Sequence, residues 1–420
     1  MQIYHLIIKE KYMKQLLFAI FLMSSVCVVA QKKKAVFIII DGIPADVIEK
    51  LNTPTIKAIS KEGGFVHAFC GGEKGNYSET PTISAVGYNT VLTGTWVNKH
   101  NVWDNDIADP NYHYYTIFRY LKEADPLKKI AIFSTWLDNR TKLVGDGLAA
   151  TGNIKFDYHF DGLELDTINY PHDKNADYIK HIDDTVSTVA GEYIQANGPD
   201  LSWVYLEHTD DMGHRHGDSP QFYDAVEAAD KRIKKVWDAI QYRKKQYGED
   251  WLIVVTTDHG RDPKTGHNHG GQSDRERSGW IATNAKNLNA EFKAGLASQA
   301  DIMPSIAAFM QINIPKKNAA EIDGTSFTGN VNAVKPSAKL TDGKITVEWK
   351  AADAKGNAKI WLTAANNFKT GGKDDYTLMA EVPVSKGQAT IDVSKIPSSF
   401  YKIVIETPTG FLNRWIIHGK

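Results

Sequence analysis

Residues 34–42 read KAVFIIIDG, a run of apolar, largely β-branched side chains that ends at an aspartate and a glycine. Such an uninterrupted apolar run is typical of a strand that is buried on both faces of a parallel sheet. Three later segments repeat the pattern: KIAIFST at 129–135, LSWVYLEHT at 201–209 and WLIVVTTDHG at 251–260. We expect the polar residues that end these runs to lie at the carboxyl ends of the strands, where open α/β sheets bind ligands.

Helix-like segments separate these predicted strands. They read TPTIKAISKEG at 53–63, SPQFYDAVEAADKRIKKVWDAIQYRKK at 219–245 and ADIMPSIAAFMQI at 300–312. Strands that alternate with helices indicate an α/β fold with a mostly parallel sheet. The sequence therefore predicts that residues 31–330 form one α/β domain, with a mostly parallel central sheet flanked by helices.

Residues 331–420 have a different texture. Short alternating runs such as KITVEWKA at 344–351 and FYKIVIET at 400–407 are separated by turn residues, which is typical of a small all-β sandwich of the fibronectin or immunoglobulin kind. We interpret NVNAVKPSAK at 330–339 as a linker. The candidate site residues all precede residue 331, so we interpret this part as an accessory domain and expect the α/β part to fold without it.

The N-terminal segment MKQLLFAIFLMSSVCVVAQ, residues 13–31, differs from both parts. A lysine, an apolar run and small residues before Gln31 form the pattern of a cleaved export signal. We therefore take Met13 as the start, residues 1–30 as the signal, and the protein as secreted or periplasmic. A membrane anchor is the alternative, but the apolar run is shorter than the ~20 residues that a span needs, so we expect no membrane span after cleavage.

Composition limits the possible partners. The 420 residues are 42% hydrophobic and 24% charged, which suits a globular protein with a large core. Lys and Arg total 49 against 50 Asp and Glu, a net charge of −1, so no overall field favours a nucleic-acid polymer. Cleavage after Ala30 would remove Cys27 and leave Cys70 as the single thiol, which excludes an internal disulfide in the mature chain.

Aspartates and histidines gather at the predicted strand ends. Carboxylate oxygens and imidazole nitrogens are ligands that suit Zn²⁺, Mn²⁺ or iron, and several strand ends can bring them to one or two ions. A single histidine of this kind would more often be an ordinary loop residue, but several such groups favour a metal site. The candidates are Asp41, then Asp210 and His214 in HTDDMGHRHG, Asp258 and His259 in TTDHG, and His267 and His269 in GHNHGG.

A candidate nucleophile lies in SETPTISAVGYNTVLTGTWVNKH, residues 78–100. Ser84 directly precedes a helix-like stretch at 85–92, where backbone N–H groups and the helix dipole favour an anion. Ser84 could simply cap this helix. The two roles are compatible, because a metal ion can activate a serine hydroxyl that would otherwise be a weak nucleophile.

These motifs together resemble the alkaline phosphatase superfamily, and most closely its nucleotide pyrophosphatase/phosphodiesterase branch. The resemblance covers roughly residues 34–327 and depends on IDG, the segment that ends in LTG, DxxGH, DHG and HGG, in that order. It implies an alkaline phosphatase-like fold and a metal-dependent phosphoric ester hydrolase that acts on a small phosphorylated substrate through a covalent phosphoserine-type intermediate.

The resemblance also assigns roles to individual residues. It implies two divalent ions, with zinc expected, one held by Asp41, Asp258 and His259 and the other by Asp210, His214 and His269. Ser84 matches the nucleophile between the ions, with Thr82 and Thr80 as competitors. Asn105 matches an asparagine that binds a phosphate oxygen. The DxxGH spacing selects Asp210 over Asp211, and the HGG segment selects His269 over His267.

Substrate class is the remaining question. A sulfatase is disfavoured because residues 84–88, SAVGY, lack the proline and arginine of the C/S-x-P-x-R motif. A phosphomonoester needs an additional cation, and Asp138 stands where a related monoesterase branch has lysine, so only Arg140 could supply one. We therefore favour a phosphodiesterase or nucleotide pyrophosphatase. A phosphomonoesterase is the first alternative, and a surface-binding protein without catalytic activity is the second.

Overall fold

An eight-stranded sheet forms the centre of the structure, a computed structural model in which residues 31–417 are described. The predicted export signal lies outside these residues. Neighbouring strands follow the order β4-β3-β5-β1-β6-β7-β2-β8. Strand β7 runs antiparallel to β6 and to β2, and the other pairs are parallel. The predicted fold class, a mostly parallel sheet flanked by helices, is confirmed.

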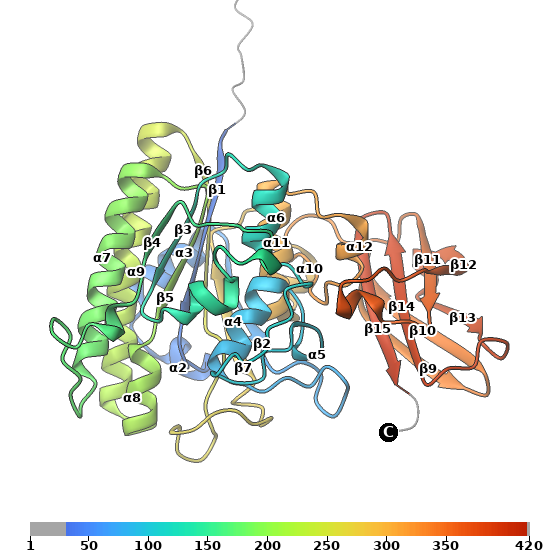
Figure 1. The fold of residues 1–420 in the computed structure, drawn as a ribbon, viewed down its shortest axis with the longest axis horizontal. Helices are drawn as coiled ribbons and strands as arrows, with labels where there is room; N and C mark the ends of the chain where they lie inside the picture. The colour runs from blue at the N-terminus through green and yellow to red at the C-terminus, as the bar shows by residue number, and fades with distance from the viewer. Residues whose placement is uncertain (1–30, 418–420) are drawn as a thin grey trace, which may run out of the picture. The chain divides into compact units, whose positions relative to one another are not determined.

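The strands that we predicted from apolar runs form the middle of this sheet (Figure 1). Further strands lie at both sides, where shorter or more polar segments gave a weaker signal. The bounds are β1 Lys33–Ile40, β2 Gly64–Phe69, β3 Ile130–Ser134, β4 Tyr158–Phe160, β5 Leu201–Leu206, β6 Asp250–Thr256, β7 Ser278–Thr283 and β8 Ala297–Ser298.

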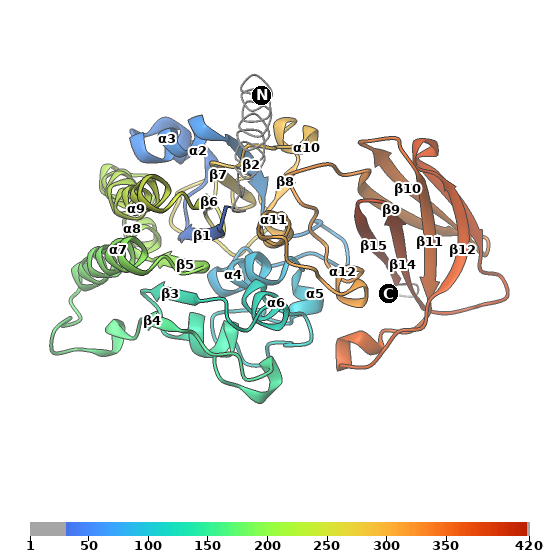
Figure 2. The same cartoon turned by 90° about the horizontal axis from the view of Figure 1, so that it is seen from above.

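Helices cover both faces of the sheet (Figure 2). One face carries α2 Ala45–Lys50, α3 Pro54–Glu62, α7 Asp177–Asn197 and α9 Pro220–Tyr247, with α8 His208–His216 beside them. The other face carries α4 Ser84–Thr93, α5 Val97–His100, α6 Ile117–Ala124 and α11 Ile302–Met310. The short helices α10 Ala290–Lys293 and α12 Lys316–Ala319 lie before and after α11 in the chain. Within residues 31–417, no helix is long and apolar enough to cross a membrane.

Strand β1 shows why its sequence has no polar position. Phe37 and Ile39 pack into the core on the α4 side, while Val36 and Ile38 pack into the core under α7 and α9. Successive side chains of a strand point to opposite faces, so a strand with helices on both sides is apolar throughout. The polar residues are thereby confined to the strand ends, and Asp41 is the first residue after β1.

Seven antiparallel strands form the C-terminal part. One sheet has the order β13-β10-β9 and the other β12-β11-β14-β15, and both contribute side chains such as Ile345 and Ile403 to one core. The bounds are β9 Ala333–Thr341, β10 Lys344–Ala351, β11 Asn357–Thr363, β12 Thr377–Pro383, β13 Gln388–Asp392, β14 Phe400–Thr407 and β15 Gly410–Ile417. The predicted all-β sandwich is present.

The segment that we interpreted as a linker is largely a strand. Within 330–339, β9 begins at Ala333, so this interpretation was wrong for most of its length. Strand β9 lies at the edge of its sheet, and it accommodates Pro336 there because an edge strand leaves some backbone N–H groups unpaired. Lys335 also has a φ of 53°, which a sequence pattern does not reveal.

Buried charged groups join the two parts of the chain. Lys99 of α5 is fully enclosed, and its ammonium group donates to Asp323 at 2.6 Å and to Asn413 of β15 at 2.8 Å. Lys402 of β14 is equally enclosed and pairs with Glu321 at 2.7 Å and with Asp374 at 2.7 Å. Removing the sandwich would take Asn413 from Lys99 and Lys402 from Glu321. These contacts argue against the independent folding that we expected of the α/β part.

We expect Lys402→Met to lower the free energy of unfolding by about 3–5 kcal/mol, because it leaves two buried carboxylates without their cation. The matched control is Lys316→Met. Lys316 pairs with Glu406 at the surface, and its side chain is 83% exposed, so the change should stay within about 1 kcal/mol. Urea unfolding of both variants measures the difference. Equal stability of the two variants would show that the buried contacts do not hold the parts together.

Candidate active site

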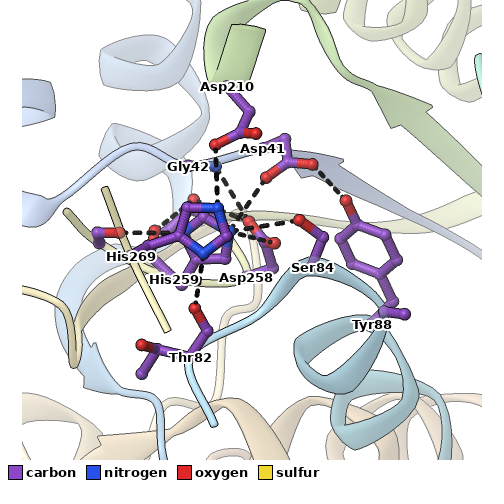
Figure 3. Close-up of polar contacts among 12 residues, drawn as sticks. Asp41, Gly42, Thr82, Ser84, Tyr88, Asp210, Asp258, His259 and His269 are labelled. Atoms are coloured by element: carbon purple, nitrogen blue, oxygen red, sulfur yellow. Dashed lines mark hydrogen bonds and ion pairs between the residues drawn. The ribbon is translucent and has the colours of Figure 1, made fainter. Parts of the chain in front are cut away.

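The site lies at the carboxyl ends of three neighbouring strands, β5, β1 and β6, beside the start of α4. Asp41 follows β1, Asp210 lies in the first turn of α8 after β5, and Asp258 follows β6. Figure 3 shows that these three carboxylates point toward one another. The parallel order of the strands therefore brings together aspartates that are far apart in the sequence.

The first group consists of Asp41, Asp258 and His259, all of them buried. The Nε2 atom of His259 lies 3.4 Å from Asp41 Oδ1 and 3.2 Å from Asp258 Oδ2. His259 uses Nδ1 for the backbone carbonyl of Gly260, at 2.9 Å, which leaves the Nε2 lone pair facing the two carboxylates. Within residues 31–417, those two carboxylate oxygens have no hydrogen-bond partner.

The acid–base properties of this group suit a cation. Burial raises the pKa of Asp41 well above its ordinary value, and the charges of Asp258 and Asp210 raise it further. Burial also raises the pKa of Asp258. Burial and the neighbouring His269 lower the pKa of His259 well below its ordinary value, so its imidazole is neutral. Orphaned carboxylate oxygens around a neutral imidazole nitrogen are a donor set that fits a divalent metal ion.

The second group consists of Asp210, His214 and His269. The Nε2 atoms of the two histidines lie 3.0 Å apart, and His214 Nε2 is 3.2 Å from Asp210 Oδ2. His269 uses Nδ1 for the backbone carbonyl of Thr82, at 2.9 Å, so its Nε2 is also left as an acceptor. Two imidazole nitrogens at this distance need a proton or a cation between them. This group therefore also fits a metal ion.

The structure distinguishes between candidate metal ligands that lie close together in the sequence. His267 turns its Nδ1 toward the backbone carbonyl of His214, at 2.8 Å, and takes no part in either group. Asp211 is likewise outside both groups. Asp210, by contrast, lies within reach of both: its carboxylate groups with His214 and His269 and also with Asp41 and His259. The two predicted ion sites are thus adjacent, with Asp210 between them.

Two glycines permit the close packing behind these ligands. A Cβ atom on Gly213, the glycine of the DxxGH motif, would lie 2.0 Å from Cζ of Arg261. A Cβ atom on Gly87 of α4 would lie 2.8 Å from the backbone oxygen of Asp258. Glycine at these positions lets α8 lie directly on the arginine and lets the helix that begins at Ser84 approach the loop after β6.

Ser84 is the first residue of α4, and its hydroxyl lies 3.4 Å from Nε2 of His259. The two competing hydroxyl groups are used elsewhere. Thr82 Oγ1 donates to the carbonyl of Gly271 at 2.8 Å, and Thr80 Oγ1 donates to the carbonyl of Ser78 at 2.8 Å. Of the three hydroxyl groups considered, only that of Ser84 contacts a candidate metal ligand.

Asn105 lies in the loop after α5, and its Oδ1 accepts a hydrogen bond from the backbone N–H of Ala85 at 3.0 Å. This bond ties the asparagine to the residue next to Ser84. Because Oδ1 is used in this way, the amide NH₂ group remains to donate to an anion. The structure thus places Asn105 at the start of α4, as the role implied by the resemblance requires.

Arg140 does not join the site. Its guanidinium pairs with both oxygens of Asp161, at 2.6 and 3.0 Å, and with Asp146 at 2.8 Å. These two carboxylates neutralise the arginine, so its contacts give no support to our expectation that it binds substrate. Asp138, which stands where a related monoesterase branch has lysine, pairs with Lys142 at 2.8 Å.

Three further residues lie close to the ligands. Tyr88 and Tyr205 donate hydrogen bonds to Asp41, and Arg261 pairs with Asp210. Arg261 is fully buried and also donates to the backbone carbonyls of Gly42, Asp210, Gly266 and His267. Burial opposes ionisation of Asp210, but Arg261 and His214 outweigh it and hold the pKa of this carboxyl below its ordinary value.

A signal for two of these residues was available. Tyr88 follows Ser84 by four residues, which places it on the same face of the helix. Arg261 directly follows the DHG motif, and a charged residue inside a buried strand-end loop needs a partner. Nothing in the local pattern of β5 distinguishes Tyr205 from its apolar neighbours.

Comparison with known proteins adds a family assignment. The sequence model of a family described as type I phosphodiesterase / nucleotide pyrophosphatase matches residues 35–384. The match begins in β1 and ends one residue after β12 of the C-terminal sandwich. A search of curated proteins gives no match.

Solved structures are similar to this chain at low sequence identity. The crystal structure of Ps i-CgsB in complex with k-i-k-neocarrahexaose has a TM-score of 0.50 and 16% identity, covering 76% of this chain and 82% of its own. The structure of BT1596, a 2-O GAG sulfatase, has a TM-score of 0.48 and 11% identity, covering 87% and 86%. Murine ectonucleotide pyrophosphatase / phosphodiesterase 5 has a TM-score of 0.43 and 14% identity, covering 67% and 96%.

Proposed function

Because the chain belongs to the type I phosphodiesterase / nucleotide pyrophosphatase family, we propose that it hydrolyses a phosphodiester or pyrophosphate bond of a small phosphorylated substrate, with Ser84 as nucleophile. The resemblance that we drew from the motifs is confirmed by the family match, and the family is one of metal-dependent hydrolases of the alkaline phosphatase superfamily. We propose, beyond the family, which bond is cleaved and which role each residue has.

One observation supports the proposal above all others. Ser84 is the first residue of a helix, and its hydroxyl lies 3.4 Å from His259 Nε2. The hydroxyl is thus at the edge of a set of carboxylates and imidazoles that need a cation. A helix start favours an anion, and a metal ion lowers the pKa of a hydroxyl that it binds. The position therefore supplies both conditions that a serine needs to act as a nucleophile.

The proposed reaction has two steps. In the first, a bond forms between Ser84 Oγ and phosphorus while the bond from phosphorus to the leaving oxygen breaks, and the leaving group departs as an alcohol or a phosphate after gaining the serine proton through solvent. In the second, water displaces Ser84 from phosphorus and restores the serine proton. The Asn105 amide donates to a non-bridging phosphate oxygen and so holds the phosphorus in line with Ser84.

Two metal ions fit the residues present. Asp41, Asp258 and His259 would hold one ion, and Asp210, His214 and His269 the other, and the Ser84 hydroxyl lies beside the first group. Zinc suits this set of oxygen and nitrogen ligands. When bound, such ions neutralise charge on the attacking, leaving and non-bridging oxygens. The orphaned oxygens of Asp41 and Asp258 are the feature of the chain that supports the first of these sites.

A diester is favoured over a monoester by charge. Two divalent ions supply four positive charges, which three carboxylates and the Ser84 alkoxide balance. The buried guanidinium of Arg261 adds a positive charge, but it pairs with Asp210 and donates to backbone carbonyls, so it is bound by the protein and not offered to a substrate. A monoester brings about two negative charges near neutral pH and would need a further cation, whereas a diester brings one. Arg140, the one arginine that the sequence offered for this purpose, is neutralised by Asp146 and Asp161. We place the activity outside the cytoplasm on the basis of the predicted export signal, residues 1–30 with Met13 as the start.

We expect kcat/KM for bis-p-nitrophenyl phosphate to exceed that for p-nitrophenyl phosphate by at least about tenfold, because the site lacks the additional cation. The measurement is p-nitrophenolate release under identical buffer and zinc concentrations. The Ser84→Ala variant, purified in parallel, corrects for contaminating phosphatase, and p-nitrophenyl sulfate tests the sulfatase alternative.

The alternatives predict different outcomes. A hundredfold preference for the monoester would replace this proposal by a phosphomonoesterase. No turnover of any of the three compounds by a protein that has bound its metal would favour the surface-binding alternative.

A further inference from the structure

Two buried tyrosines hold one oxygen of Asp41. Tyr205 Oη lies 2.7 Å from Asp41 Oδ2, and Tyr88 Oη donates to the same oxygen. The two hydroxyl oxygens lie 2.8 Å apart. The three residues are at most 2% exposed, so bulk water does not reach this cluster. Figure 3 shows Asp41 between Tyr88 on one side and His259 on the other.

The number of protons determines how the three oxygens bond. Two phenol groups carry two protons, and three short contacts connect the three oxygens, so only two of the contacts can be hydrogen bonds at one time. When Asp41 is ionised, both protons go to Oδ2, because hydrogen bonds to a charged acceptor are stronger than those between neutral groups. Both lone pairs of Oδ2 are then occupied.

The other oxygen of Asp41 has the opposite environment. Oδ1 is buried, has no hydrogen-bond partner within residues 31–417, and lies 3.4 Å from Nε2 of His259. One oxygen of the carboxylate is thus saturated by protein donors, while the other faces the ligand group. Rotation of the carboxylate would break both tyrosine bonds and leave a buried charged oxygen without a partner, which is costly.

We propose that Tyr88 and Tyr205 are positioning residues that restrict Asp41 to metal binding through Oδ1 alone. The inference rests on the ion site of the proposed function, but not on the identity of the substrate. Hydrogen bonds from outside the ligand set orient a metal ligand and keep it charged, and their loss commonly weakens metal binding by about 10- to 100-fold.

Tyr88 also connects this restraint to the nucleophile. It stands four residues after Ser84 in α4, one helical turn along the same face. Its hydroxyl joins α4 to Asp41 after β1, and Tyr205 joins β5 to the same carboxylate. The pair therefore holds the nucleophile helix and one metal ligand in a constant relative position.

The test compares Tyr88→Phe, Tyr205→Phe and the double variant with the unmodified protein after removal of metal. Tyrosine to phenylalanine removes only the hydroxyl and keeps the ring that packs in the core. Zinc affinity, measured by competition with a chromophoric chelator, should fall about 10-fold or more in each single variant. The visible absorption of bound Co²⁺ reports the number of ligand atoms, and it should change in the double variant, where Asp41 can offer both oxygens.

Tyr114→Phe is the matched control. Tyr114 is also buried, but its hydroxyl has no hydrogen-bond partner within the described part of the chain, so zinc affinity and the Co²⁺ spectrum should stay unchanged. The inference is overturned if both tyrosine variants bind zinc with the affinity of the unmodified protein and give the same Co²⁺ spectrum, or if Tyr114→Phe alters them equally. If only the double variant fails to fold, the two single variants decide. Lack of diester turnover would contradict the proposed function and leave these metal-binding results to decide this inference.

Discussion

Replacing Ser84 with alanine should lower kcat for a phosphodiester by about 10⁶-fold, the loss that follows removal of the serine nucleophile from a hydrolase whose site is otherwise intact. The residue lies at the start of α4 and contacts His259 through its hydroxyl alone. Structure should be preserved, because the side chain caps no backbone group and alanine is a good helix former. Steady-state kinetics, thermal melting and metal content of the same preparation measure the three expectations.

Thr82→Ala is the comparison for this variant. Its hydroxyl bonds to Gly270 and Gly271, beside His269, so its loss should weaken metal binding at the second group and leave the nucleophile in place. Added zinc should then restore much of its activity, but should not restore that of Ser84→Ala. An active Ser84→Ala together with an inactive, metal-replete Thr82→Ala would show that we have assigned the wrong hydroxyl.

Removal of metal is the second change with a large expected effect: exhaustive chelation should abolish turnover, and zinc should restore it. Without a cation, the adjacent carboxylates of Asp41, Asp210 and Asp258 repel one another and would repel a phosphate. Elemental analysis before and after chelation gives the metal content that corresponds to each rate. Full activity in a protein shown to be free of metal would exclude the proposed ion sites.

This metal binding should depend on pH in a defined direction. Burial raises the pKa of Asp41 and of Asp258, so below these raised values the metal-free carboxyls hold protons that an ion must displace. Affinity should therefore fall as the pH falls, by up to about tenfold per pH unit for each displaced proton. Competition with a chelator at pH 8 and pH 6 measures the slope.

The parts of the fold that were predictable have strong local signals. Strand β1 could be located because helices bury both of its faces, which requires apolar residues at every position. The positions of Asp41 and Asp258 followed from the same reasoning, since the carboxyl ends of adjacent parallel strands meet at one edge of the sheet.

The parts that were not predictable depend on tertiary partners. Arg140 pairs with Asp146 and Asp161. Both aspartates belong to loops whose course no periodic pattern specifies. Polar residues alternate along strand β9 because one of its faces is exposed. This pattern and its proline suggested a linker. The role of Tyr205 depends on a hydrogen bond to a residue 164 positions earlier in the chain.

The buried ammonium of Lys99 also has a consequence for synthesis of the chain. Its partner Asn413 follows 314 residues later, and a ribosome that adds about 5–20 residues per second needs roughly 15 to 60 s to reach it. During that interval the nascent α/β part contains an ammonium group whose final partner does not yet exist. The last packing step around α5 therefore has to wait until β15 has been synthesised, so the α/β part cannot complete its folding before most of the sandwich is available.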